Sequence, residues 1–128
     1  MEANELRIGN YVLYNGNIVK VWGLSGDVEH ISLLSKAGIL GDKISKIKPI
    51  PLTEEILLKC GFVKHNMLGY SEHFTYQKYI KGETITLNAL YNSDFSILLH
   101  SVARKIDSLH RLQNIIFALT GKELKINL

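Results

Sequence analysis

The N-terminal part of the chain contains short strand patterns separated by turn residues, and this feature restricts the fold more than any other. Residues 11–14 (YVLY) and 18–24 (IVKVWGL) flank the sequence Asn15-Gly16-Asn17. Asn-Gly between β-branched and aromatic runs predicts a β-hairpin, because both residues tolerate the positive φ of a tight turn. The chain is therefore expected to begin with a two-stranded antiparallel unit.

Two further strand patterns follow the hairpin. Residues 26–33 supply the third, and residues 42–50 supply the fourth, which Pro49 and Pro51 end because proline removes ladder donors. Several short strands joined by glycine turns in so short a segment are typical of small barrels. Residues 1–52 are thus predicted to form an SH3-like small β-barrel or bent sheet.

Residues 53–128 are predicted to form an α-β-β-β-α-β segment that packs with residues 1–52 as one compact unit. A short helix begins at Thr53, a good N-cap residue, and ends at Gly61, which can adopt the left-handed conformation. A three-stranded antiparallel meander, a C-terminal helix capped by Asp107 or Ser108, and a short terminal strand follow. The predicted meander strands and terminal strand are residues 70–80, 84–91, 95–102 and 123–128. The predicted fold class is α+β.

The C-terminal helix carries two stripes of side chains at helical spacing. The first is apolar and is expected to dock on the meander. It consists of Leu109, Leu112, Ile116 and Leu119. The second is mostly polar and is expected to be partly covered by the N-terminal segment. It consists of His110, Gln113, Asn114 and Phe117.

Aromatic residues leave two interpretations open. Tyr70, Phe74 and Tyr76 alternate along one predicted strand, so they form either the inner face of the meander or a platform for stacking nucleic-acid bases. Trp22 is likewise either a core residue or an exposed ligand contact. The pattern alone does not decide between core and surface.

No known catalytic motif occurs in the sequence. Five histidines are scattered without metal-ligand spacing, and there is no phosphate-binding loop, dinucleotide fingerprint or nucleophile elbow. The single cysteine, Cys60, precedes a predicted helix end and has no partner for a disulfide or a metal pair. The sequence therefore indicates no cofactor, no metal and no recognisable enzyme active site.

Charge is distributed unevenly along a chain whose formal net charge is +3. Residues 104–128 carry five basic and two acidic residues, and such an excess can attract phosphate groups. Asp107 lies between two of these basic residues at helical spacing and can neutralise them. The candidate nucleic-acid-binding residues are Lys46, Lys48, Arg104, Lys105 and Arg111.

Composition and hydropathy exclude several other classes of protein. Hydrophobic residues make up 46% of the chain and charged residues 21%, as in ordinary globular domains rather than disordered ones. No apolar run approaches the ~20 residues that a membrane helix needs. The first ten residues lack the pattern of a secretory signal. A cytoplasmic protein without a membrane partner is expected.

Three stretches together resemble a family of small uncharacterised bacterial proteins that is frequent in Bacteroidetes genomes, prophages and mobile elements. They are RIGNYVLYNGNIVKVWGL, KPIPLTEEILLKCGF and LHRLQNIIFALTGKEL. Members of that family tend to carry an RIGNYV strand, a PIPLTEEWLLKFGF-like helix and a closing HxLQNLYFALTGEEL. The resemblance implies a bacterial cytoplasmic origin and a prophage or mobile-element setting. It implies no activity and transfers no site residues.

These observations favour a non-catalytic binding or adaptor module, with a protein partner preferred over nucleic acid. The alternative is a nucleic-acid-binding protein that uses the basic residues named above. A third hypothesis is that the protein is an enzyme whose active site is assembled from dispersed histidines and carboxylates. The sequence leaves the partner and the oligomeric state open.

Overall fold

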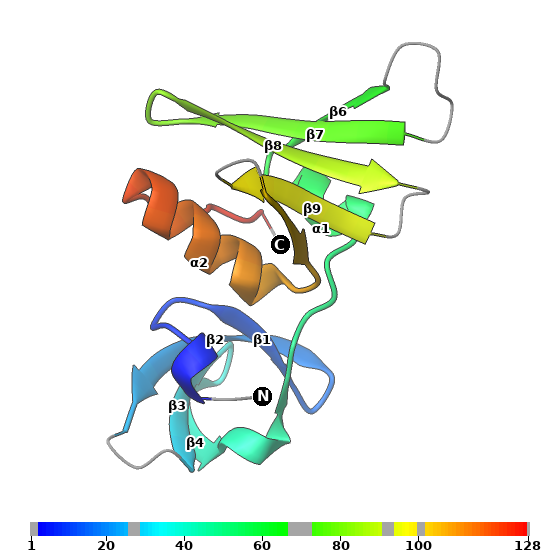
Figure 1. The fold of residues 1–128 in the computed structure, drawn as a ribbon. Coiled ribbons are helices and arrows are strands. Elements are labelled where there is room, and N and C mark those ends of the chain that lie inside the picture. The colour runs from blue at the N-terminus through cyan, green and yellow to red at the C-terminus, as the bar shows by residue number, and fades with distance from the viewer. Residues whose placement is uncertain (1–2, 26–28, 67–72, 91–93, 100–101, 128) are drawn as a thin grey trace. The chain divides into compact units, whose positions relative to one another are not determined.

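The computed structural model describes residues 3–25, 29–66, 73–90, 94–99 and 102–127 (Figure 1). Within these ranges it contains two antiparallel five-stranded sheets and two α-helices, which confirms the predicted α+β class. The chain divides into two compact units. Unit 1 comprises Met1–Pro51 and Ser108–Asn114, and unit 2 comprises Leu52–Asp107 and Ile115–Leu128.

Unit 1 contains a sheet with strand order β4-β3-β2-β1-β5. Its elements are η1 (Ala3–Glu5), β1 (Tyr11–Tyr14), β2 (Asn17–Leu24), β3 (His30–Ser35), β4 (Gly38–Lys43), η2 (Ile44–Lys46) and β5 (Ile47–Lys48). Among the described residues the outermost strands, β4 and β5, share no ladder, so the sheet does not close into a barrel. The strand predicted over residues 42–50 is wrong, because the 3₁₀ helix η2 interrupts it.

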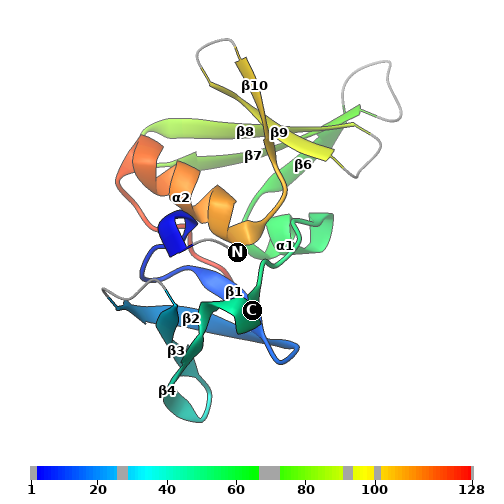
Figure 2. The same ribbon diagram turned by 60° about the horizontal axis from the view of Figure 1, so that its bottom comes forward.

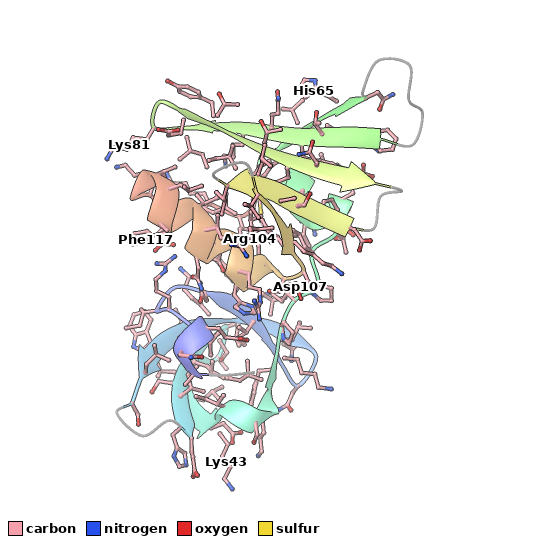
Figure 3. The ribbon with its side chains drawn as sticks, in the orientation of Figure 1. Lys43, His65, Lys81, Arg104, Asp107 and Phe117 are labelled. Atoms are coloured by element: carbon pink, nitrogen blue, oxygen red, sulfur yellow. The ribbon has the colours of Figure 1, made fainter. Side chains whose placement is uncertain are left out.

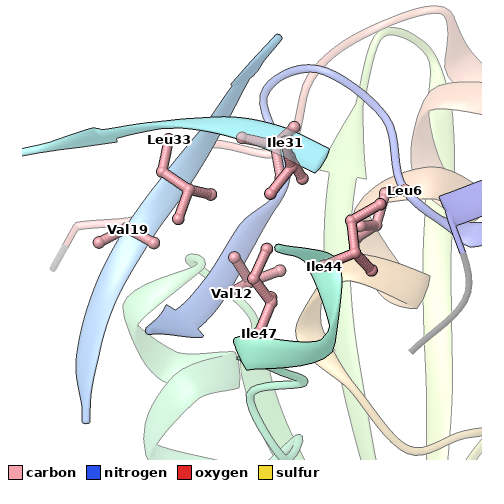
Figure 4. Close-up of a cluster of buried hydrophobic side chains, with 8 residues drawn as sticks. Leu6, Val12, Val19, Ile31, Leu33, Ile44 and Ile47 are labelled. Atoms are coloured by element: carbon pink, nitrogen blue, oxygen red, sulfur yellow. The ribbon is translucent and has the colours of Figure 1, made fainter. Parts of the chain in front are cut away.

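Local turn chemistry explains the first hairpin. Asn15 and Gly16 have φ values of 50° and 77°, the left-handed conformations that the two-residue turn requires. Tyr14 pairs with Asn17 directly beside this turn, as the Asn-Gly signal predicts. One face of the resulting sheet is buried. Its core comprises Leu6, Val12, Val19, Val21, Ile31, Leu33, Ile44 and Ile47 (Figure 4).

Unit 2 contains the second sheet, with strand order β10-β9-β8-β7-β6. Its strands are β6 (Val63–Asn66), β7 (His73–Ile80), β8 (Glu83–Leu90), β9 (Asp94–Leu99) and β10 (Val102–Ile106). The predicted three-stranded meander corresponds to β7, β8 and β9. The two edge strands, β6 and β10, were not predicted, and the strand predicted over residues 95–102 extends beyond β9 to the first residue of β10.

Two helices cover one face of the second sheet. These are α1 (Glu54–Lys59) and the second half of α2 (Leu109–Thr120), and both lie on the same side of the strands (Figures 1 and 2). The Thr53 hydroxyl oxygen accepts a hydrogen bond from the Ile56 N–H at 3.2 Å, so the predicted N-cap is confirmed. Gly61 ends α1 with a φ of 89°, which also agrees with the prediction.

Alternate residues of the strands in unit 2 form its core, on the side of the sheet that faces the helices. Ile85, Leu87 and Ala89 of β8 are buried, as their period-two spacing predicts. Leu87 pairs with Tyr76 on one side and with Ile97 on the other, and both of these are buried as well. The inner face is therefore continuous across three strands.

The predicted terminal strand does not form. Residues 123–127 have no strand structure in the part of the chain that the structure describes. Leu124 is nevertheless buried, and the Asn127 N–H donates a hydrogen bond to the Lys59 carbonyl at 3.0 Å. The segment is therefore fixed by one apolar anchor and the end of α1 rather than by a sheet edge.

Candidate functional site

The five basic candidate residues are divided between the two units. Lys46, Lys48 and Arg111 belong to unit 1, and Arg104 and Lys105 belong to unit 2. Arg104 (Figure 3) and Lys105 are part of β10, so neither residue lies in the last helix. Consecutive strand residues point to opposite faces, so these two side chains do not form a common patch.

Three of these basic residues contact a carboxylate. Lys46 lies 3.3 Å from Asp42, Lys105 lies 3.6 Å from Asp94, and the Arg111 guanidinium lies 3.2 Å from Glu5. All three cations are at least half exposed, so each pair contributes little to stability. Each pair does reduce the local positive potential that a phosphate would meet.

The Asp42 carboxylate has a second partner besides Lys46. The Tyr14 hydroxyl donates a hydrogen bond to it, which lowers the pKa of Asp42 and raises that of Tyr14. The carboxylate is therefore held in its charged form beside Lys46. This arrangement ties β1 to β4 and keeps a negative charge at that end of unit 1.

Polar side chains at the start of α2 are structural contacts within unit 1. The buried Gln113 side chain accepts a hydrogen bond from the Tyr11 N–H at 2.9 Å and donates one to the Gly9 carbonyl at 3.2 Å. The side-chain oxygen of Asn114 accepts a hydrogen bond from the side-chain amide of Asn10 at 2.8 Å. The side-chain amide of Asn114 donates one to the main-chain carbonyl of Glu5 at 2.9 Å. The predicted cover of this polar stripe by the N-terminal segment is thus confirmed for these residues.

Of the aromatic residues of β7, Tyr76 belongs to the core, Phe74 is partly buried and Tyr79 is exposed. Tyr76 is fully buried and its hydroxyl donates to Glu54 at 2.8 Å, while burial raises the pKa of this tyrosine. Phe74 is partly buried with the Lys64 ammonium 4.0 Å from its ring centre. Tyr70 lies outside the described residues. A base-stacking platform on this face is therefore wrong for Tyr76, and the core interpretation holds there.

Among the described residues we looked for a reactive thiol and for a group of metal ligands. Burial raises the pKa of the Cys60 thiol to about 11, so the reactive thiolate is scarce at neutral pH. Within the described ranges, no three His, Cys, Asp or Glu side chains gather in a way that would hold a metal ion. Neither helix in those ranges has the length and apolarity needed to cross a bilayer.

The outward face of the unit 1 sheet carries an apolar surface that the sequence analysis did not identify as a site. Val19, Val21 and Leu33 point into the core, so the alternate residues of their strands point outward. The large apolar residues of β2, β3 and β4 on this outward face form what is here named the outer patch. It consists of Ile18, Trp22, Leu34 and Ile39.

The pairing of β2, β3 and β4 shows that the outer patch extends over these three adjacent strands. Leu34 pairs with Ile39 on one side and with Lys20 on the other. Ile39 is 60% exposed and Ile18 is 42% exposed. The Lys20 ammonium lies 5.4 Å from the centre of the Tyr11 ring on β1, so this cation borders the outer patch on its β1 side.

A β-bulge positions the tryptophan of the outer patch. The register between β2 and β3 shifts between Val21 and Gly23, so Trp22 is the unpaired residue, and 49% of it is exposed. Bulges commonly redirect a side chain in this way. Of the two interpretations of Trp22, the structure supports the exposed one. The nearly unbroken apolar run in residues 18–24 was the available signal for a strand with apolar side chains on both faces.

Unit 2 contains a hollow of about 430 Å³ between β8, β9 and the end of α2. This hollow, here named the notch, is lined by both apolar and polar residues and has one charged lining residue, Glu83. Its lining residues are Glu83, Thr84, Ile85, Thr86, Asn88, Ile97, Leu98, Leu99 and Leu119. No basic residue is among them, so the notch offers nothing that would attract a phosphate group.

Comparison of the chain with known protein families, with curated proteins and with solved structures finds no match. The functional conclusions therefore rest on the geometry of the outer patch and the notch.

Proposed function

We propose that this chain is a non-catalytic adaptor that binds a partner protein through the outer patch of unit 1. The observation that carries the proposal is the exposure of Ile18, Trp22 and Ile39 on one sheet face. The solvent face of an antiparallel sheet ordinarily carries polar side chains. Several exposed apolar side chains on such a face are typical of a protein-binding site.

The chemistry of the outer patch indicates what the partner presents. Trp22 is a side chain of the type that often dominates the binding energy of protein interfaces. Lys20 adds a positive charge at the β1 side of these apolar residues. The complementary surface is therefore apolar with a carboxylate opposite Lys20, and it is a protein surface rather than a phosphate backbone.

We further propose that unit 1 has an SH3-like arrangement. The order β4-β3-β2-β1-β5 and the 3₁₀ helix η2 between β4 and β5 support this assignment. SH3-like barrels host several kinds of binding, so the fold itself does not choose the partner. The bacterial, cytoplasmic and prophage-associated setting is part of the same proposal and rests on the sequence resemblance.

Nucleic-acid binding is the alternative, and the basic excess of residues 104–128 favours it. The division of the candidate residues between two units, and the carboxylates beside Lys46, Lys105 and Arg111, weaken it. Binding of this kind would show a steep loss of affinity with rising salt. The adaptor proposal expects no such response.

Affinity capture of a partner by the tagged full chain tests the proposal. Ile39→Lys places a charge in the outer patch and should weaken binding of the purified partner at least about tenfold, because a buried unpaired charge is costly. Val63→Lys is the matched control, since Val63 is an equally exposed apolar strand residue of unit 2. Equal binding by Ile39→Lys, or capture that nuclease treatment abolishes, would reject the proposal.

A further inference from the structure

The ladder between β8 and β9 does not include the first residues of β8. It runs from Leu90↔Asp94 to Leu87↔Ile97, and beyond this point the two strands diverge (Figure 1). The first four residues of β8, Glu83–Thr86, pair with β7 alone among the described residues. One side of this stretch is therefore an open strand edge inside the sheet, and it borders the notch.

Hairpin geometry shows which main-chain groups face this opening. Lys81 and Gly82 form a two-residue turn with φ values of 47° and 81°, so the flanking Ile80 and Glu83 form a hydrogen-bonded pair. Along β8 the main-chain groups then alternate between the two sides. Thr84 and Thr86 direct their N–H and C=O groups away from β7 and into the notch.

The opposite wall of the notch follows the same alternation. Asn88 directs its main chain toward β9 and pairs there with Ser96. Leu98 lies two residues beyond Ser96, so its main chain faces the opening as well. Exposed main-chain groups of this kind are the feature to which an additional strand binds.

Side chains complete a pocket next to these main-chain groups. Ile85 and Ile97 are buried, while Leu119 at the end of α2 is 45% exposed. A volume of about 430 Å³ falls within the usual range of roughly 300–1,000 Å³ for ligand pockets. Glu83 is the single charged residue of the lining, so the notch favours an occupant with an apolar side chain for Ile85, Ile97 and Leu119 and a positive charge near Glu83.

We propose that the notch binds an extended segment of a partner protein. The segment adds a short strand to β8 at Thr84 and Thr86, and it places one apolar side chain against Ile85, Ile97 and Leu119. A Lys or Arg of the segment lies near Glu83. This inference rests on the proposed protein-binding function and gives the adaptor a second binding surface, which is independent of the outer patch.

Selection of phage-displayed random nonapeptides on the immobilised full chain tests this proposal. The enriched peptides should share apolar residues at alternate positions, a nearby Lys or Arg, and no proline between them. Fluorescence anisotropy then measures the affinity of the best peptide in synthetic form. Leu119→Lys should weaken that affinity at least about tenfold, since the charge would be buried beneath the peptide.

Two other variants make the result decisive. Leu58→Lys is the matched control, because Leu58 is an exposed apolar residue of α1 outside the notch, and it should bind the peptide as the native chain does. Thr86→Pro removes an N–H that faces the notch and should also weaken binding. Circular dichroism establishes that each variant is folded.

Failure of this proposal can be separated from failure of the adaptor function. Absence of enriched peptides, or equal affinity for the native chain, Leu119→Lys and Thr86→Pro, overturns the strand-addition site. Ile39→Lys, which alters only the outer patch, should bind the selected peptide normally. A chain that captures its partner through the outer patch but selects no peptide retains the first function and loses the second.

Discussion

At the scale of single residues, the polar side chains near the start of α2 have a structural role. Gln113 and Asn114 satisfy main-chain groups of the N-terminal segment, including the Tyr11 N–H and the carbonyls of Gly9 and Glu5. A helix can replace sheet hydrogen bonds in this way when its amide side chains reach the backbone. Conspicuous polar residues in a sequence are therefore not in themselves signs of a catalytic site.

Gln113→Ala should lower the free energy of unfolding by about 2 kcal/mol, because it leaves main-chain groups of Gly9 and Tyr11 without their partner. Urea denaturation measures this loss. Arg111→Ala removes an exposed ion pair with Glu5 and should cost less than about 1 kcal/mol. Equal costs for the two substitutions would show that the Gln113 contacts are unimportant.

At the scale of elements, α2 departs from its sequence pattern in the last turn. Leu109, Leu112 and Ile116 are fully buried, as the helical spacing predicts. Leu119 was expected in the same buried stripe, and this prediction is wrong because nearly half of it is exposed. The divergence of β8 and β9 explains the difference, since the sheet leaves an opening where Leu119 would otherwise be covered.

The contrast along α2 can be measured directly. Ile116→Ala should cost roughly 2–5 kcal/mol of unfolding free energy, the usual range for a buried large-to-small substitution. Leu119→Ala should cost less than about 1 kcal/mol, because much of this side chain remains in solvent and makes fewer contacts. Similar costs in urea denaturation would mean that Leu119 is buried in solution.

The features of the fold that depend on neighbouring residues in the sequence were predicted correctly. The Asn15-Gly16 turn, the Thr53 cap and the alternation in β8 were all readable because neighbouring residues determine them. The edge strands β6 and β10 were missed, since short strands with mostly exposed side chains show little alternation and depend on pairing with distant segments. The notch could not be predicted from the sequence either, because it forms where the pairing between two distant strands ends.

At the scale of the whole molecule, each unit presents its own candidate surface. Unit 1 exposes apolar side chains on a sheet face, and unit 2 exposes main-chain groups and a pocket inside its sheet. The first surface suits a folded partner and the second suits an extended segment. Two such surfaces on one chain are what an adaptor between proteins requires.

Site-specific photocrosslinking in living cells that carry the gene tests whether the outer patch binds a partner protein. A benzophenone side chain replaces Ile39 in one version of the chain and Val63 in another, so the probe lies in the outer patch or on β6 of unit 2. If the outer patch is the binding surface, position 39 should give one protein adduct of discrete mass and position 63 none of that mass. No protein adduct from position 39, or the same adduct from both positions, would contradict it.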